Sequence, residues 1–189
     1  MKKRISGFMA ELQITNKFED LQYLLDALEI AKKSEIIQMS RRRVGAIIVK
    51  DGKVVGSGYR TTRILQEDPY KDITYHAEHI AIIQAGKKAK GATIYCTLEP
   101  CACRSVLPGS WEPPDPCCKL IYNAGIKRVI FPKRDTSVGS GGAEYLISMG
   151  VEVCICNTGV EEFEKLMDNT PWRKDVAELD KGKTYIKAR

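Results

Sequence analysis

The sequence predicts an α/β fold, in which a mixed sheet of about five strands is covered by helices on both faces as a three-layer α/β/α sandwich. Two observations lead to this prediction. The chain has 189 residues, of which 43% are hydrophobic and 29% charged, values typical of one globular domain with its own core. Strand-like and helix-like patterns alternate after one predicted hairpin, and such alternation produces a mixed sheet between helices.

The first predicted elements are a helix and a hairpin. Apolar residues recur at spacings of three and four between residues 18 and 33 and predict a helix with one buried face. Apolar runs at 44–49 and 54–59 flank Asp51-Gly52, a dipeptide typical of a tight turn, and predict two antiparallel strands. Residues 60–75 are polar and aperiodic, so we predict a loop there.

The rest of the chain alternates helices with strands. Glycines follow three of the apolar helical segments, where they are suited to ending a helix. Two stretches interrupt the alternation and are predicted loops, one rich in proline (104–116) and one rich in glycine (137–142). We predict helices at 77–85, 117–124, 144–149 and 160–167, and strands at 92–97, 127–131 and 151–156.

The domain is predicted to span residues 18–168, between an N-terminal extension (1–17) and a charged C-terminal tail (169–189). The apolar part of the first twelve residues is too short for a signal peptide, and no apolar run approaches the ~20 residues of a membrane span. Seven cysteines, an odd number, cannot all pair within the chain. We therefore expect a cytoplasmic protein with reduced thiols and no membrane contact.

Charge and histidine content narrow the search for a site. The net charge of +6 favours phosphate-bearing ligands, with nucleic acid as a less favoured partner, although diffuse charge is common on solvated surfaces. The chain has only two histidines, His76 and His79. Any site that needs imidazole must therefore lie at the start of the helix predicted at 77–85.

Three short segments at the ends of predicted elements contain the residue types of a zinc site. His76-Ala77-Glu78 opens one helix, Pro100-Cys101 follows a strand, and Cys117-Cys118 opens another helix. Zinc prefers tetrahedral coordination by imidazole and thiolate, and a catalytic site uses three protein ligands so that the fourth position can hold water. Glu78 lies too near His76 along the chain to be a comfortable ligand beside it. It is placed to move protons in a hydrolytic deamination.

These residues resemble the zinc-dependent cytidine deaminase superfamily, whose signature combines H-x-E with P-C-x-x-C. In the commonest members the second cysteine follows the first by three positions, but here position 104 is arginine. Pro116-Cys117-Cys118 is instead similar to the pyrimidine deaminases of riboflavin synthesis, in which a proline-containing insertion separates the two cysteines. The resemblance covers residues 20–156, without the reductase domain of the bifunctional enzymes. It implies a cytidine deaminase-like fold with His76, Cys101 and Cys117 as ligands of Zn²⁺.

Two other cysteines remain alternatives for the third ligand. Cys118 would suit a helix that starts one residue later, and Cys103 is disfavoured because it lies only two positions from Cys101. His79 falls on the next turn of its helix, and we predict that it packs or forms hydrogen bonds instead of binding metal.

The resemblance implies that the substrate is a free pyrimidine nucleotide or nucleoside, either an aminopyrimidine of the riboflavin pathway or a cytidine or deoxycytidylate. The alternatives are a deaminase of bases in tRNA or single-stranded DNA, and a non-catalytic zinc-binding partner subunit. Family members commonly form dimers or tetramers, so we expect a homo-oligomer. Possible phosphate contacts are Arg42, Arg43, Lys133 and Arg134, and Trp111 could stack on a base. Each of these residues could equally belong to a solvated or anchored loop.

Overall fold

A six-stranded mixed sheet lies at the centre of the computed structural model, which describes residues 11–34, 43–65, 68–106, 115–157, 161 and 184–187. Strand β2, next to the edge strand β3, is antiparallel to both of its neighbours, whereas the strands on the β6 side of the sheet are parallel to one another. The predicted mixed sheet is thus confirmed, with six strands instead of about five. In sheet order the strands are β1 (Gln13–Thr15), β9 (Glu152–Cys156), β8 (Arg128–Phe131), β6 (Thr93–Cys96), β2 (Gly45–Lys50) and β3 (Lys53–Tyr59).

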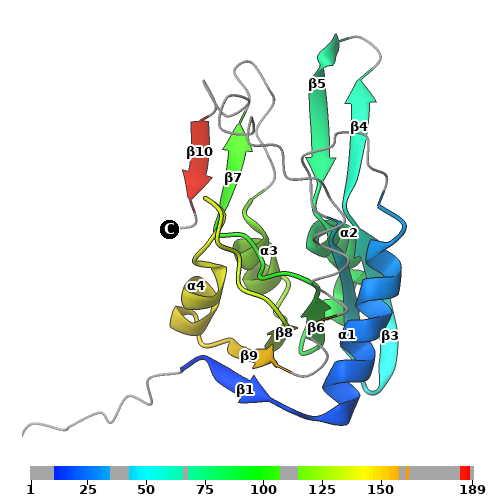
Figure 1. The fold of residues 1–189 in the computed structure, drawn as a ribbon, viewed down its shortest axis with the longest axis vertical. Coiled ribbons are helices and arrows are strands. Elements are labelled where there is room, and N and C mark those ends of the chain that lie inside the picture. Colours follow the sequence, from blue (N-terminus) through cyan, green and yellow to red (C-terminus); the bar gives the residue numbers. More distant parts are fainter. Residues whose placement is uncertain are drawn as a thin grey trace, which may run out of the picture.

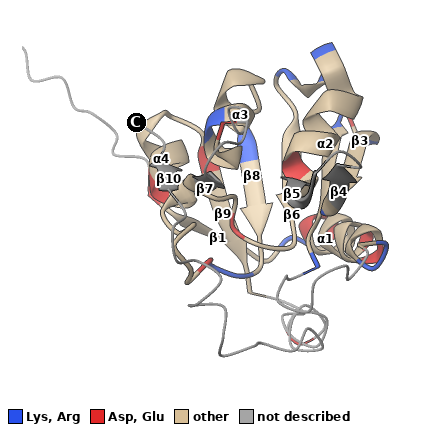
Figure 2. Cartoon of the chain, turned by 90° about the horizontal axis from the view of Figure 1, so that it is seen from above, with Lys and Arg blue, Asp and Glu red and all other residues tan. Residues whose placement is uncertain are grey.

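Helices cover both faces of this sheet, as Figure 2 shows from above. Helix α1 (Phe18–Ala31) lies on one face. The other face is covered by α2 (Ala77–Ala85), α3 (Cys117–Asn123) and α4 (Gly142–Ser148), and the short 3-10 helix η1 (Gly86–Ala89) follows α2. Alternate residues of β2, β6, β8 and β9 enter the two apolar layers, as the period of a strand requires. The predicted three-layer α/β/α sandwich is confirmed.

Two glycines allow helix α2 to lie close to the β2–β3 hairpin. A Cβ atom at Gly56 would stand 2.3 Å from the carbonyl oxygen of Ala81, and one at Gly58 would stand 2.3 Å from that of Ala77. No side chain fits at such distances, so the helix backbone can approach the strand only where glycine is present. This contact sets the position of the start of α2, where His76 precedes the helix and Glu78 lies in its first turn.

Two antiparallel ribbons stand at one end of the sheet (Figure 1). Strands β4 (Thr61–Leu65) and β5 (Asp68–Tyr75) form one, and β7 (Cys103–Val106) and β10 (Thr184–Lys187) form the other. The prediction of a loop at 60–75 is therefore wrong, because β4 and β5 lie there. The prediction of a loop at 104–116 is wrong at its start, where β7 continues to Val106. Strand pairing satisfies backbone groups whatever the side-chain pattern, so a ribbon outside the main core need not show apolar alternation.

The remaining differences concern the two ends of the chain. Strand β1 adds a parallel edge to the sheet from the segment that we expected to be an N-terminal extension. Of the helix predicted at 160–167, only Glu161 is described, and it is helical. In the part of the chain that the structure describes, none of the helices has the length and apolar character needed to cross a membrane.

Candidate metal centre

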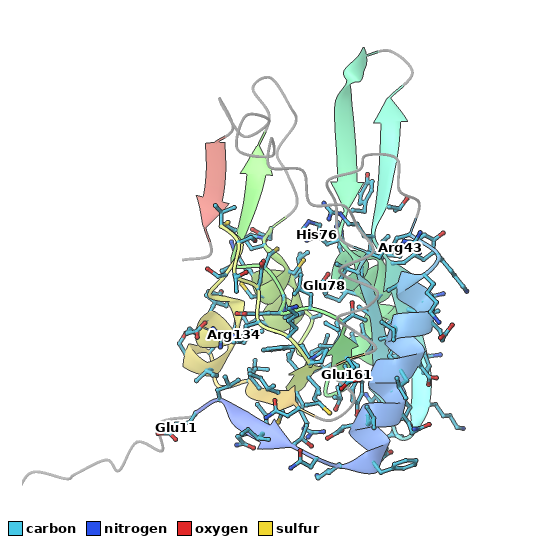
Figure 3. The ribbon with its side chains drawn as sticks, in the orientation of Figure 1. Glu11, Arg43, His76, Glu78, Arg134 and Glu161 are labelled. Carbon is cyan, nitrogen blue, oxygen red and sulfur yellow. The ribbon has the colours of Figure 1, made fainter. Side chains whose placement is uncertain are left out.

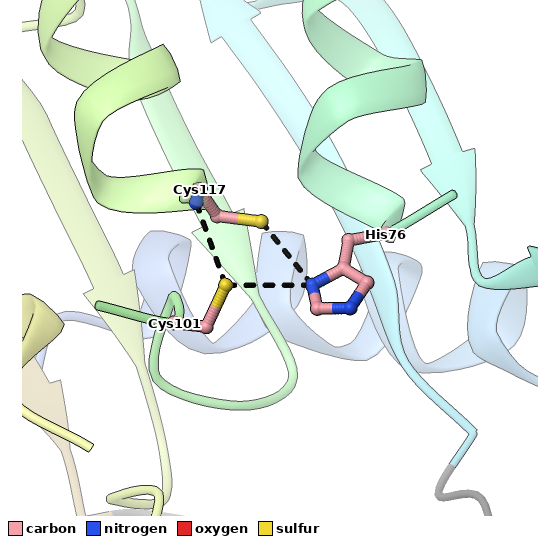
Figure 4. A group of neighbouring side chains, drawn as sticks. All are labelled: His76, Cys101 and Cys117. Atoms are coloured by element: carbon pink, nitrogen blue, oxygen red, sulfur yellow. Dashed lines mark hydrogen bonds between the residues drawn. The ribbon is translucent and has the colours of Figure 1, made fainter. Parts of the chain in front are cut away.

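Three elements bring one imidazole and two thiols together at the end of the sheet that carries the two ribbons (Figure 4). His76 is the residue that joins β5 to α2, Cys101 lies in the segment after β6, and Cys117 is the first residue of α3. Their potential ligand atoms all lie within 4.8 Å of one another. In the described part of the chain, this is the single group of three or more such residues that could hold a metal ion.

The imidazole and both thiols contact each other directly. The Nδ1 atom of His76 lies 3.3 Å from Sγ of Cys117 and 3.5 Å from Sγ of Cys101. The backbone N–H of Cys117 donates a hydrogen bond to the Cys101 sulfur at 3.4 Å, which ties the start of α3 to the other thiol. Both cysteines are buried, whereas His76 is partly exposed. The group is therefore open on the side of the imidazole.

The electrostatic environment distinguishes Cys101 from Cys118. Hydrogen bonding with the Cys117 side chain, together with the charge of His76, holds the pKa of the Cys101 thiol well below its usual range, against burial, which acts to raise it. Burial and the nearby charge of Cys101 raise the pKa of the Cys118 thiol to about 12. Metals bind the thiolate form, so the environment of Cys101 favours the form that a ligand needs, and the position of the sulfurs separates Cys117 from Cys118.

The structure brings together the predicted ligand set and leaves both alternatives outside it. Cys118 is the next residue of α3, and its backbone N–H donates to the carbonyl oxygen of Cys101 at 3.2 Å. The thiol of Cys103 donates instead to the carbonyl oxygen of Val138 at 2.8 Å. One imidazole nitrogen and two thiolate sulfurs form the donor set that zinc prefers, with one position left for a further ligand.

Glu78 lies one residue inside α2 and is 3% exposed. Burial raises the pKa of the Cys96 and Cys118 thiols, and the nearby carboxylate of Glu78 acts in the same direction. Figure 3 shows Glu78 next to His76 at the same end of α2. The ring of His79 lies against Tyr75, with centroids 5.8 Å apart, and is not part of the ligand set.

The residues predicted to contact the substrate differ in their surroundings, and two of them lie outside the described part of the chain. Arg43 is partly exposed, and Figure 3 places it level with His76 along the long axis of the molecule. The guanidinium of Arg134 binds two carboxylates, those of Glu99 and Glu144. Lys133 accepts a backbone hydrogen bond from Glu99. Arg42 and Trp111 lie outside the described residues.

Sequence reasoning assigned no role to Glu99, although it lies two positions before Cys101. The structure buries its carboxylate completely, at 0% exposure, beside the segment that carries the thiol. An acidic residue is seldom fully buried unless it is paired. In the sequence, the burial of Glu99 was indicated only by its position between a buried strand and the segment that contains Cys101.

A family model described as the cytidine and deoxycytidylate deaminase zinc-binding region matches residues 18–133. The chain is 40% identical over 136 residues to the riboflavin biosynthesis protein RibD of Aquifex aeolicus, which covers 71% of this chain and 34% of that protein. It is 35% identical over 139 residues to a diaminohydroxyphosphoribosylamino-pyrimidine deaminase of Buchnera aphidicola (subspecies Schizaphis graminum), covering 72% of this chain and 84% of that one.

A solved structure gives the same result. The diaminohydroxyphosphoribosylaminopyrimidine deaminase/5-amino-6-(5-phosphoribosylamino)uracil reductase of Thermotoga maritima superposes with a TM-score of 0.63 at 32% identity, covering 85% of this chain and 42% of that one. The chain thus spans about a third of the Aquifex protein and less than half of the Thermotoga protein, but most of the Buchnera deaminase.

Proposed function

The chain belongs to the cytidine and deoxycytidylate deaminase zinc-binding family, as its two sequence motifs indicated, and on that premise we propose that it is a zinc-dependent deaminase of pyrimidines. One observation carries the proposal: the Nδ1 atom of His76 stands within 3.5 Å of the sulfurs of Cys101 and Cys117, beside the buried carboxylate of Glu78. A purely structural zinc site uses four protein ligands and has no use for an acid beside it.

His76, Cys101 and Cys117 would hold the zinc ion. The two thiolates neutralise its charge, and the N–H bond from the start of α3 to Cys101 favours the ionised sulfur. A bound zinc ion supplies the Lewis acidity that makes a water molecule nucleophilic near neutral pH. The partly exposed side of His76 leaves a route by which substrate and water can reach the site.

Glu78 moves the protons that the reaction requires. Its carboxylate accepts a proton from the attacking water and delivers it to the neighbouring ring nitrogen of the pyrimidine. As the new C–O bond becomes a carbonyl and the C–N bond breaks, the second proton of the water passes through the same carboxylate to the leaving amine. One water is consumed and one ammonia released, so Glu78 ends in its starting state. Burial at 3% exposure keeps bulk water from competing for these protons.

The substrate class that the relatives support is a free phosphoribosylaminopyrimidine. The Buchnera deaminase bears that activity in its name and is matched over 84% of its length. Such a substrate has a phosphate, and Arg43, a partly exposed cation in the segment before β2, is our candidate for its contact. Cytidine and deoxycytidylate are the competing substrates, because they too present an exocyclic amine on a ring carbon next to a ring nitrogen.

The decisive experiment measures ammonia release from a panel of free compounds: diaminohydroxyphosphoribosylaminopyrimidine, deoxycytidylate and cytidine. We expect turnover of the first, loss of turnover after a chelator removes zinc, and recovery when zinc is returned. Turnover of deoxycytidylate or cytidine alone would contradict the substrate assignment. Full activity in metal-free protein would contradict the mechanism.

A further inference from the structure

The segment that carries Cys101 is held on both sides by residues 133–143. Before the cysteine, the backbone N–H of Glu99 donates to the carbonyl oxygen of Lys133 at 2.9 Å. After it, the N–H of Ala102 donates to the carbonyl oxygen of Gly139 at 2.7 Å. A Cβ atom at Gly139 would lie 3.4 Å from Cβ of Cys101. The two segments therefore touch at the ligand itself.

The carboxylate of Glu99 binds both ends of this second segment. One oxygen, Oε2, accepts the N–H of Asp135 at 3.0 Å and pairs with Nε of Arg134 at 2.8 Å. The other, Oε1, accepts the N–H of Ala143 at 3.0 Å. These contacts draw residues 135 and 143 to one side chain and close the intervening loop. Its two oxygens thus contact two backbone N–H groups and one guanidinium.

Burying this charge has a cost that an apolar residue would avoid. Removing a carboxylate from water is costly, and the pairing offsets that cost only when its geometry is good. Pro100, with its restricted backbone, is the single residue between Glu99 and Cys101. A displacement at Glu99 would therefore be transmitted to the cysteine with little loss.

From these contacts we infer that Glu99 is a positioning residue for the metal centre. Glu99 holds the Cys101 sulfur in place before the metal binds. This inference rests on the metal-binding role proposed above for Cys101. Glu99 itself need not touch metal or substrate. It acts through the loop that it closes, and it engages Arg134 in doing so. Residues that orient metal ligands commonly contribute a factor of about 10 to 100 to metal affinity.

The test compares Glu99→Gln with Glu144→Gln. Glu144 contacts the same Arg134, but its side chain is 61% exposed, so its substitution changes the charge without disturbing the buried contacts. Zinc affinity is measured by competition with a chromophoric chelator, and the absorption of the Co²⁺-substituted protein reports the geometry of the thiolate ligands. Thermal unfolding of each zinc-free protein shows whether it folds.

We expect Glu99→Gln to fold, to bind zinc about 10 to 100 times more weakly and to show an altered Co²⁺ spectrum, whereas Glu144→Gln matches the wild type. A folded Glu99→Gln variant with unchanged affinity and spectrum would overturn the inference. If that variant does not fold, Arg134→Gln is tested instead, because it removes one of the three contacts of Glu99 at a side chain that is 34% exposed. Unchanged zinc affinity in Arg134→Gln overturns the inference, and weakened affinity supports it. Failure of the wild type to bind zinc would instead reject the proposed function.

Discussion

The carboxylate of Asp20 and the guanidinium of Arg128, 108 positions apart in the sequence, form two parallel hydrogen bonds of 2.8 and 2.9 Å. Asp20 is 2% exposed and also accepts bonds from the hydroxyls of Thr15 and Tyr95. One side chain of α1 thus joins strands β1, β6 and β8. This network lies on the face of the sheet opposite the metal ligands, so it affects stability without touching the site.

Removing Asp20 should destabilise the fold. Asp20→Ala leaves the Arg128 guanidinium, which is 17% exposed, without its main partner. Breaking a buried ion pair in this way typically lowers the free energy of unfolding by about 3 to 5 kcal/mol. Urea unfolding measures the loss. Asp26→Ala, at an exposed position on the same helix, is the control and should change the free energy by less than about 0.5 kcal/mol. Equal losses in the two variants would show that the network adds nothing.

The contribution of Asp20 should depend on pH in one direction. Although burial acts to raise its pKa, the hydrogen bonds from Arg128, Thr15 and Tyr95 and the charge of Arg128 lower the pKa of the folded state below 3.8. A lowered folded-state pKa means that the stabilisation is complete above the unfolded-state value and is lost as pH falls through the folded-state value. The stability difference between wild type and Asp20→Ala should therefore be constant near neutrality and shrink below pH 3.8. A difference that grows on acidification would refute this assignment.

Exchange of a single atom distinguishes the two neighbouring cysteines of α3. Cys117→Ser should lose most bound zinc, because its sulfur is one of the two that contact Nδ1 of His76. Cys118→Ser should keep about one zinc per chain, because that thiol, with a pKa of about 12, lies outside the ligand set. Metal analysis of the purified variants measures both. The reverse result would move the ligand by one residue.

Glu78→Gln should separate metal binding from catalysis. The amide keeps the size of the side chain but cannot take up a proton, so ammonia release should fall by at least about 100-fold. Zinc content should remain that of the wild type, because Glu78 is not one of the three grouped ligands. Steady-state turnover and metal analysis on the same preparation provide the comparison. Undiminished turnover would exclude Glu78 as the proton carrier.

Arg43→Ala tests the proposed phosphate contact. Loss of one charge-assisted hydrogen bond should raise KM for the phosphorylated aminopyrimidine by about tenfold, without a comparable effect on its dephosphorylated form. Lys53→Ala is the matched control, because Lys53 is an exposed cation at the first residue of β3, in the hairpin that Arg43 precedes. A similar rise in KM for both forms of the substrate would show that Arg43 does not recognise the phosphate.

The chemistry of the site could be predicted from the sequence because its residues lie in short local patterns. His76-Ala77-Glu78 opens a helix that apolar spacing and Gly86 delimit, and its two functional side chains are only two positions apart. Apolar periodicity reports which face of an element is buried, and this was enough to predict a mixed sheet between helix layers. The four helices that form these two layers and the five strands of the main sheet other than β1 follow from such local signals.

Tertiary structure decided the features that depend on residues far apart in the chain. Whether Cys117 or Cys118 faces His76 depends on how the first turn of α3 is oriented against a helix 40 residues earlier, and both cysteines are equally consistent with the local pattern. No pattern in either segment alone predicts that β7 pairs with β10, or that β1 pairs with β9. The sequence suggested that Arg134 is a cation available for a phosphate or for solvent, but in the structure it forms an ion pair with the buried Glu99. Local patterns specify which side chains avoid water, whereas the partner that satisfies a buried charge or an unpaired strand is set only when distant segments meet.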